Sequence, residues 1–300
     1  MPGKQVNELD TLPSFTDTSL VPVHNGAGLK KGTLTQLVNY LGTKFSNPNL
    51  LINPNFKINI KGKSTYTSGY SVDRWKVNNV TLNASTLVLS SAGGTFLQSL
   101  ENKPTGTFTV TLNVASVTGI VKFAWQDGST YKSGVAISKG VNTYTFSASS
   151  LTWVGIEIAS GASVQLIYMK LEEGSVATDY VEPNGNEEYV KCLWYSRPIT
   201  GLRNGYISSN KIYLSVPECA SMRISTPTPK EFNLAGWIYI GSSMISVNKS
   251  DITAVTLDKY KELVLTPTSA LAQTLTSKNY KNISYVIDNC GVVQLDAEIY

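Results

Sequence analysis

Charged residues are scarce in this chain of 300 residues, of which Asp, Glu, Lys and Arg make up 15%, with a net charge of +4. The basic residues are scattered, and no Arg/Lys run could follow a phosphate backbone, so we expect no nucleic-acid partner. No apolar run approaches the ~18 residues of a transmembrane helix, so we expect no membrane insertion. The start, MPGKQVNELD, lacks the charged and apolar stretches of a secretory signal, which predicts assembly in the cytoplasm of the producing cell.

Histidine and cysteine are nearly absent, and their scarcity argues against most catalytic and metal chemistry. The single histidine, His24, lies in the sequence HNG with no nucleophile elbow nearby, so we interpret it as a turn residue. The cysteines Cys192, Cys219 and Cys290 are odd in number and far apart, which favours reduced, partly buried thiols over a disulfide framework or zinc site. We expect no cofactor; a structural Ca²⁺ on oxygen ligands stays open, because such sites leave little linear signature.

What the chain does contain is typical of β-structure. Apolar residues make up 42% of it, Thr, Ser, Asn, Val and Gly recur, and long helical patterns are nearly absent. Residues 107–114 alternate between an apolar and a polar face, and SVQLIYMKLEEG is apolar on both faces, as in a central strand. Short strands separated by regular turns predict a two-sheet sandwich. The turn signals are Gly93-Gly94, Pro104-Thr105-Gly106, Asp127-Gly128 and Lys139-Gly140.

Residues 1–45 are predicted to form a small separate unit. Two extended pieces flank the sequence HNGAG, and a helix with one apolar stripe follows, for which Thr33 is placed as the N-cap. The stripe consists of Leu34, Leu37, Val38 and Leu41. At roughly 40 residues this unit is too small to be stable without docking or oligomerising.

A hinge divides the remainder of the chain. The Asn/Pro-rich stretch 46–56 is interpreted as a linker into a long β region that ends near Leu171. The stretch from Lys170 to Tyr195 then turns at EPNGN and starts a short helix, with Asn186 as its expected cap. Further β-patterns follow to the C-terminus. The predicted domains are 1–45, 46–183 and 184–300.

Several phrases resemble bacteriophage tail-fibre and receptor-binding proteins, in the same order along the chain. MKLEEGSVATDYVEPNGNEEYVKCLWY resembles the junction that closes a carbohydrate-binding-like sandwich in that family and leads into a terminal tip domain, with Trp194 in place of a tyrosine or similar residue. NLLINPNF…GYSVDRWKV resembles the start of that sandwich. IYLSVPECASMRISTPTPKEF and LDAEIY resemble the tip domain, and ELDTLPSFTDTSLVPVHNG…KKGTLTQLVNYL is similar to virion-anchoring segments.

The resemblance implies a mainly β protein with a jelly-roll-like β-sandwich, a second β tip domain and a small α/β N-terminal anchor. It also implies a non-catalytic protein of the virion tail that is assembled in the host cytoplasm and attaches to host cell-surface polysaccharide. The other implied partners are a tail, baseplate or other virion protein, docked through residues 1–45, and further copies of the chain in a homotrimer. No heptads or triple-β repeat support the trimer independently.

Side chains suited to hold a sugar, aromatic rings with nearby polar groups, gather in two parts of the chain. In FAWQDGSTYKSG, Trp125 shares strand parity with Phe123, so a place in the core is its alternative. Trp153 faces away from the apolar stripe of its strand, whereas Trp75 is expected to be a core anchor. The tip candidates are expected at or near loops. The predicted ligand-binding residues are Trp125, Gln126, Asp127, Tyr131, Trp153, Arg203, Asn204, Tyr206, Trp237 and Tyr239.

Two other functions compete with glycan attachment. A purely structural virion component would use the same sandwich for protein contacts alone. A glycan depolymerase would need two carboxylates about 5–10 Å apart in a cleft. Its candidates have simpler structural interpretations, and the chain lacks the long repeat of a β-helix, so we expect no enzyme. These candidates are Asp73, Glu101, Asp127, Glu157, Glu172 and Glu173.

Overall fold

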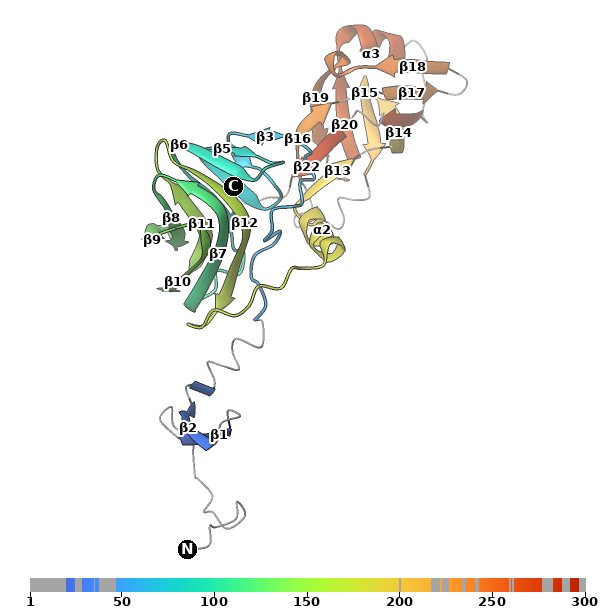
Figure 1. Ribbon diagram of the computed structural model, residues 1–300. Helices are drawn as coiled ribbons and strands as arrows, with labels where there is room; N and C mark the ends of the chain where they lie inside the picture. The colour runs from blue at the N-terminus through green and yellow to red at the C-terminus, as the bar shows by residue number, and fades with distance from the viewer. Residues whose placement is uncertain are drawn as a thin grey trace, which may run out of the picture.

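The computed structural model describes residues 20–24, 29–34, 36–37, 47–199, 201–216, 222, 227–233, 236–240, 243–258, 260, 262–276, 283–287 and 292–296. Antiparallel strands and two short α-helices make up this part of the chain (Figure 1), which confirms the prediction of a mainly β protein. None of its helices is long and apolar enough to cross a membrane.

The elements fall into three groups along the chain. The N-terminal strands are β1 (Leu20–His24) and β2 (Leu29–Thr33). The first large sheet contains β3 (Thr65–Tyr66), β4 (Gly69–Tyr70), β5 (Trp75–Asn83), β6 (Val88–Ser99), β7 (Gly106–Thr118), β8 (Val121–Asp127), β9 (Thr130–Ala136), β10 (Gly140–Ala148), β11 (Leu151–Ile158) and β12 (Ser163–Glu173). The third group contains α2 (Gly185–Leu193), β13 (Ser196–Ile199), β14 (Gly201–Ser208), β15 (Lys211–Ser215), β16 (Thr228–Asn233), β17 (Gly236–Ile240), β18 (Ser243–Val247), the 3₁₀ turn η3 (Lys249–Asp251), β19 (Ile252–Leu257), β20 (Glu262–Pro267), α3 (Ser269–Thr276), β21 (Ile283–Ile287) and β22 (Val292–Asp296).

The first large sheet has the order β10-β7-β12-β6-β11-β8-β9, with β5 also paired to β6, and β3 and β4 paired to β5. Strand β6 belongs to both halves, because its start pairs with β12 and its end pairs with β11. The sheet therefore folds over one hydrophobic core that extends from Leu51 to Leu171. Trp75, fully buried and stacked on Phe96 at 4.9 Å between ring centroids, is the core anchor that the sequence predicted.

The Gly93-Gly94 pair was expected to form a turn between strands, but it lies inside β6, where the strand passes from one half of the sheet to the other. A Cβ on Gly94 would lie 2.2 Å from the backbone oxygen of Asn78, and Gly93 has a φ of +105°. The pair therefore permits a close approach and a bend within one strand, and it does not end the strand. The other three turn signals lie where one strand ends and the next begins, as predicted.

The predicted alternation of residues 107–114 is confirmed for its apolar face: Phe108, Val110, Leu112 and Val114 are all buried. The polar face differs from the expectation, because Thr109 and Thr111 are buried as well. The Thr109 hydroxyl donates to the backbone oxygen of Gly174 at 2.8 Å, in the segment that follows β12. That segment returns over the outer face of the sheet.

A buried ion pair lies beneath the returning segment. Lys170 and Glu172 are 1% and 0% exposed, and the Lys170 Nζ lies 3.3 Å from Glu172 Oε2. Thr178 connects the two: its hydroxyl accepts from Lys170 and donates to Glu172, and its backbone N–H donates to Glu172 at 2.9 Å. Lys170 also donates to the backbone oxygen of Asp179. Satisfied in this way, two charges tolerate burial that would otherwise be prohibitive.

The stretch 46–56, interpreted from the sequence as a linker, is instead built into the sandwich over its described part. Leu51, Asn53 and Phe56 are buried. Asn49 accepts the Leu171 N–H at 3.0 Å and donates to the Met169 backbone oxygen at 3.1 Å, so it pairs with β12 through its side chain. The Asn49 side chain thus takes the place of a paired backbone, a role that the amino-acid composition of this stretch does not reveal.

Helix α2 follows the returning segment and packs against the sandwich (Figure 1). The buried Glu188 accepts the Asn53 N–H at 2.7 Å, and the Arg74 guanidinium lies 3.6 Å from the centroid of the Tyr195 ring. The sequence predicted Asn186 as the cap, which is wrong: Asn184 is the N-cap, and its side chain accepts from the N–H groups of Asn186 and Glu187. The helix therefore starts two residues earlier than predicted, because the Asn184 side chain accepts from the N–H groups of its first turn.

The third group has a seven-stranded sheet, β18-β17-β21-β14-β15-β20-β19, and a three-stranded sheet, β13-β22-β16. Its hydrophobic core is separate from that of the sandwich and extends from Ile199 to Leu275, with α3 contributing Leu271 and Leu275. Met222, from the phrase that resembles a tip domain, is buried in this core, whereas Arg223 lies outside the described residues.

Near the N-terminus, β1 and β2 form the antiparallel pair expected around HNGAG, and His24 is the last residue of β1, not a turn residue. Thr33 caps the helical residues that follow, as predicted. Its hydroxyl accepts the Gln36 N–H at 3.1 Å and the Gln36 side chain accepts the Thr33 N–H at 2.9 Å, a reciprocal capping box. Val38 and Leu41 of the predicted stripe lie outside the described residues, as do Cys219 and Cys290; Cys192 is buried.

The buried ion pair generates the first prediction. Replacement of Glu172 by Ala leaves the Lys170 ammonium buried without its carboxylate, so the free energy of unfolding should fall by about 3–5 kcal/mol. The exposed neighbour gives a matched control, since Glu173→Ala should change it by less than about 0.5 kcal/mol. Urea unfolding followed by circular dichroism measures both. Equal unfolding midpoints for the two variants would contradict this account of the hinge.

The second prediction separates the two possible caps of α2. Asn184→Ala should lower the free energy of unfolding by about 1 kcal/mol, because two N–H groups lose their acceptor. Asn186→Ala should be nearly neutral or slightly stabilising, because alanine favours the helix interior. Thermal unfolding of both variants tests the assignment, and the reverse order of stabilities would restore Asn186 as the cap.

Candidate functional site

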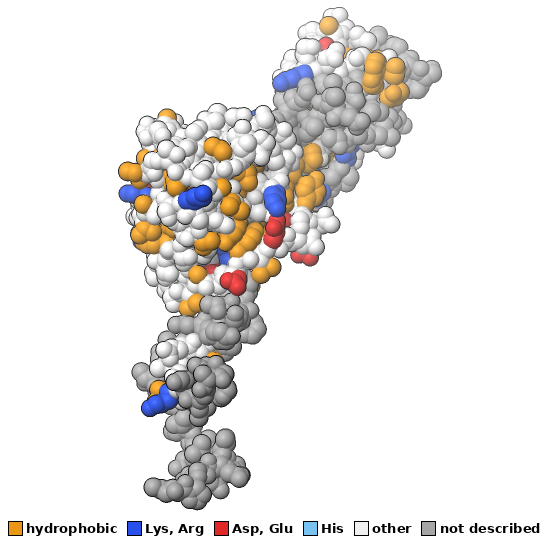
Figure 2. Space-filling view, viewed as in Figure 1, with side chains coloured by type: hydrophobic (Ala, Val, Ile, Leu, Met, Phe, Trp, Pro, Cys, Tyr) orange, Lys and Arg blue, Asp and Glu red, His pale blue; other side chains and the backbone are white. Residues whose placement is uncertain are grey.

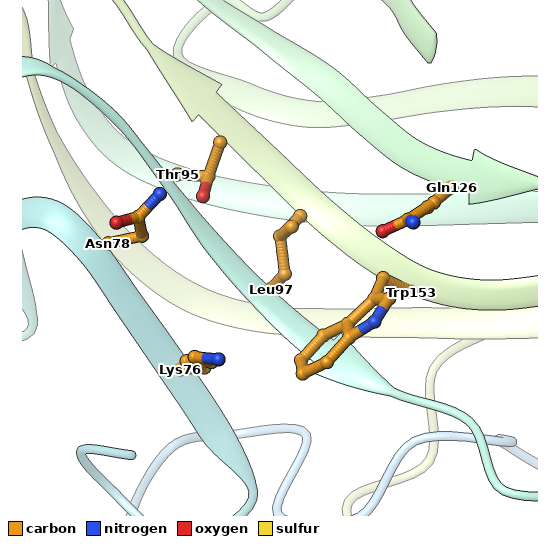
Figure 3. A pocket seen from close by; sticks show the side chains of 6 residues that line it. All are labelled: Lys76, Asn78, Thr95, Leu97, Gln126 and Trp153. Atoms are coloured by element: carbon orange, nitrogen blue, oxygen red, sulfur yellow. The ribbon is translucent and has the colours of Figure 1, made fainter. Parts of the chain in front are cut away.

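A shallow hollow of about 320 Å³ lies on the outer face of the sandwich, across strands β5, β6, β11 and β8 (Figure 3). Leu97 lies between Trp153 on one side and Thr95 on the other, with Lys76 facing Trp153. The lining combines an indole, an aliphatic floor, amides, a hydroxyl and an ammonium. The lining residues are Lys76, Asn78, Thr95, Leu97, Gln126 and Trp153.

Strand alternation explains why these side chains reach the same face. On β5, Trp75 and Val77 enter the core, so Lys76 and Asn78 point outward. The register then places Lys76 opposite Leu97, Asn78 opposite Thr95, and Trp153 opposite Gln126. Trp153 lies on the opposite face from the buried stripe of Val154, Ile156 and Ile158, as the sequence predicted.

Gly155 permits the close pairing of β11 with β6 next to the hollow. It lies opposite Leu97, two residues from Trp153 on the same face of β11. A Cβ at this position would lie 2.1 Å from the backbone oxygen of Phe96, so no other residue fits without moving β6. The missing side chain lets β11 and β6 approach closely beneath the hollow.

Two of the sequence candidates, Gln126 and Trp153, therefore line one site. A partly exposed indole provides a flat apolar surface, and the amides of Asn78 and Gln126 provide both hydrogen-bond donors and acceptors. Such a combination fits a ligand with an apolar face and a rim of hydroxyls. None of the lining groups is a nucleophile with an adjacent base, so the hollow has the chemistry of a binding site.

Sequence reasoning did not identify four of the lining residues, Lys76, Asn78, Thr95 and Leu97. The alternation of WKVNNVTLN does place Lys76 and Asn78 outside the core. What the sequence does not contain is the pairing of β5 with β6 and of β6 with β11, which brings them beside Trp153.

Trp125 does not belong to this site, and its assignment as a ligand-binding residue is corrected. It is 7% exposed and packs in the core, 4.6 Å from Phe146 and 5.6 Å from Tyr144 between ring centroids. Trp125 lies in the core because it points to the same side of β8 as the buried Phe123. Its ring is therefore not accessible to a ligand.

Asp127 organises a turn. Its Oδ1 accepts from the backbone N–H groups of Ser149 and Ser150, and its Oδ2 lies 3.0 Å from Lys132 Nζ. These interactions, led by the Lys132 hydrogen bond, lower the pKa of Asp127 to about 2. The carboxylate is thus already engaged on both oxygens, which favours a structural role over ligand contact.

Tyr131 lies beside the hollow without lining it. By register it is opposite Gln126, it is 45% exposed, and its hydroxyl donates to Glu157 Oε2 at 3.2 Å. Partial burial, together with the negative charge of Glu157, raises the pKa of the Tyr131 phenol above its ordinary value. This hydrogen bond holds the Tyr131 ring outside the hollow, on its β9 side.

The candidates in the C-terminal group lie within strands, not at loops as expected: Arg203, Asn204 and Tyr206 in β14, and Trp237 and Tyr239 in β17. The register across β21 puts Asn204, Tyr206, Trp237 and Tyr239 on the outer face, with Trp237 38% and Tyr239 39% exposed. Arg203 alternates with Asn204 and lies on the face of the buried Ile238. The structure therefore separates Arg203 from the other four.

Tyr206 has a structural partner on that outer face. Its ring stacks on Tyr213 with centroids 4.8 Å apart, and its hydroxyl donates to Glu262 at 2.8 Å. The hydrogen bond to Glu262, with burial and nearby negative charge, raises the pKa of Tyr206 to about 12. The described residues thus form two aromatic surfaces, and the one on the sandwich is hollowed and lined by the amides of Asn78 and Gln126.

Three more of the acids considered for catalysis have partners in the structure. Glu172 is paired with Lys170, Glu157 accepts from Tyr131, and Asp73 accepts the Ile60 N–H at 2.6 Å. Among the described residues, no group of three His, Cys, Asp or Glu side chains is arranged to hold a metal ion.

Comparison with known proteins adds little. No family model matches this chain, and no curated protein matches it. Among solved structures, vicilin from Corylus avellana (hazelnut) aligns with 9% sequence identity and a TM-score of 0.15, over 77% of this chain and 84% of that chain. A TM-score this low supports no statement about fold or function.

The state of Asp127 gives a pH-dependent prediction. A carboxylate whose pKa is lower in the folded than in the unfolded protein stabilises the fold above pH ~4, and this stabilisation is lost as the pH falls through about 2. Asp127→Asn should therefore lower the melting temperature at pH 7, with a difference that shrinks steadily between pH 4 and 2. Calorimetry of the wild type, D127N and the exposed control Glu173→Gln tests this. A difference independent of pH would refute it.

Proposed function

We propose that this protein is a bacteriophage tail-fibre or receptor-binding protein that attaches the virion to a glycan on the host cell surface and catalyses no reaction. Residues 1–45 would dock on a tail, baseplate or other virion protein, and the chain would act as a homotrimer. The ordered resemblance of its phrases to that family supports this proposal. So does the architecture, with an N-terminal hairpin, a sandwich and a further β unit in sequence.

We assign the first large sheet to a jelly-roll-like, carbohydrate-binding-like domain at 46–183, and the third group to a tip domain at 184–300. The presence of two separate hydrophobic cores supports a division near α2.

The observation that carries glycan attachment is the hollow around Trp153. Its indole is partly exposed and held by the sheet, so stacking a pyranose ring on it would cost little ordering of the protein. Asn78 and Gln126 lie where they can exchange hydrogen bonds with sugar hydroxyls. A single site of this size would bind weakly, and three copies on one fibre would convert weak contacts into firm attachment.

A structural role in the virion is the second candidate, and one observation favours it. Helix α2 exposes Tyr189 and Val190, and its C-cap residue Trp194 is exposed as well; Val190 is 65% and Trp194 48% exposed. Charged side chains are sparse on the visible face of the molecule (Figure 2), which also suits packing against another protein. Such contacts would coexist with glycan binding, unless the protein binds no glycan at all.

The fourth prediction tests the attachment function with matched variants. Trp153→Ala should weaken binding of the full chain to bacterial surface polysaccharides by about 30-fold, the usual effect of truncating a central tryptophan. Trp237→Ala removes a comparably exposed indole from the other aromatic surface and should leave binding unchanged.

The measurement is an array of purified bacterial polysaccharides, together with a panel of bacterial cells before and after removal of their surface polysaccharide. Loss of binding in Trp237→Ala alone would move the site to the C-terminal group. A folded wild-type protein that ignores every glycan and every cell would refute the attachment function and leave the structural role.

A further inference from the structure

The charge that lines the hollow around Trp153 is positive. Among its described lining residues, Lys76 is the only one that is charged at neutral pH, and no carboxylate lines it. Its Nζ lies 5.4 Å from the centroid of the Trp153 ring and 5.9 Å from that of Tyr70. The ammonium thus lies over the indole, within reach of an anionic group on a ligand bound beside that ring.

The positive charge of Lys76 is not neutralised within the described part of the chain. Ion pairs there join Lys57 to Glu182, Lys132 to Asp127, Lys170 to Glu172 and Lys191 to Glu188, and none includes Lys76. Its contacts are with aromatic rings, which attract a cation without cancelling its charge. An incoming anion would therefore meet an available partner.

Glu157 also lies on this face of the sheet, but its carboxylate is bound on the side away from Lys76. Glu157 lies on β11 opposite Thr95, but it accepts the Tyr131 hydroxyl at 3.2 Å. Tyr131 belongs to β9, whereas Lys76 belongs to β5, and these strands lie on opposite sides of β11 in the sheet order. The face is thus divided, with Lys76 and Trp153 facing each other and Glu157 bound to Tyr131.

We propose that the Trp153 hollow selects an anionic saccharide, in which a pyranose stacks on Trp153 while its carboxylate or phosphate group pairs with Lys76. This inference rests on the proposed glycan attachment and adds the chemical class of the ligand. A compact ammonium on a flexible stem can meet either kind of anion, so the two sources are separated by experiment. The amides of Asn78 and Gln126 then form hydrogen bonds with hydroxyls that carboxylate-bearing and phosphate-bearing saccharides both have.

The experiment compares each saccharide with a neutral counterpart. The probes are bacterial polysaccharides that contain uronic acids, each also in carboxyl-reduced form, and phosphate-bearing polysaccharides, each also in dephosphorylated form. The full-length wild type should prefer the anionic member of one pair by about fivefold, the upper range for a partly exposed ion pair, and 0.5 M salt should reduce this preference.

Three variants assign that preference to Lys76. Lys76→Gln should abolish the preference while binding to the neutral form persists, and Lys76→Arg should retain it. The matched control is Lys122→Gln, which removes a half-exposed lysine of β8 that lies opposite Glu157 and outside the hollow. It should behave as the wild type. Circular dichroism and urea midpoints verify that the variants fold.

The outcomes separate this inference from the function on which it rests. Equal binding of anionic and neutral forms by the wild type, or an unchanged preference in Lys76→Gln, would overturn the anionic ligand and leave glycan attachment intact. If the wild type binds none of the saccharides, both the ligand class and the proposed attachment are refuted. Preference for the carboxylate or the phosphate pair identifies the source of the anion.

Discussion

The burial of Lys170 and Glu172 is the constraint on which the middle of the molecule depends. Two charges with almost no exposure are stable only when each has its partner and its remaining hydrogen bonds. Thr178 satisfies both, so the chain must return across the outer face of β12 and β7 after the strand ends. That path delivers the chain to Asn184 and the start of α2. The burial of this ion pair therefore explains why the sequence KLEEGSVAT contains Lys170, Glu172 and Thr178 at this spacing.

The same region connects the parts of the chain that are distant in sequence. The Asn47 N–H donates to the Thr178 hydroxyl, and the buried Glu188 of α2 accepts the Asn53 N–H. Arg74, in the left-handed backbone region with a φ of 73°, places its guanidinium against Tyr195. A strained backbone at a buried arginine persists only where its surroundings fix it, which here are the sandwich and the residues after α2.

The periodicity of the sequence predicted the strands well and the segments beside them poorly. The alternation of 107–114 and of 151–158 fixed which side chains enter the core, and it placed Trp153 outside. The same parity assigned Trp125 to the core, against its selection as a ligand residue. Gly93-Gly94 was misinterpreted because a glycine pair permits a bend within a strand as readily as a turn after it. Asn and Pro in 46–56 suggested a linker because side-chain pairing by Asn49 has no linear pattern.

The sequence by itself determined the β class, the central position of β12, the Thr33 cap and the outward direction of Trp153, because each follows from local periodicity or from hydrogen bonds within one turn of chain. Only the tertiary structure decided which outward residues meet. Lys76, Leu97, Gln126 and Trp153 come from four strands. Their approach depends on the pairing order β5-β6-β11-β8, and strand pairing is set by the burial of the whole core, a sum that no single stretch of sequence contains.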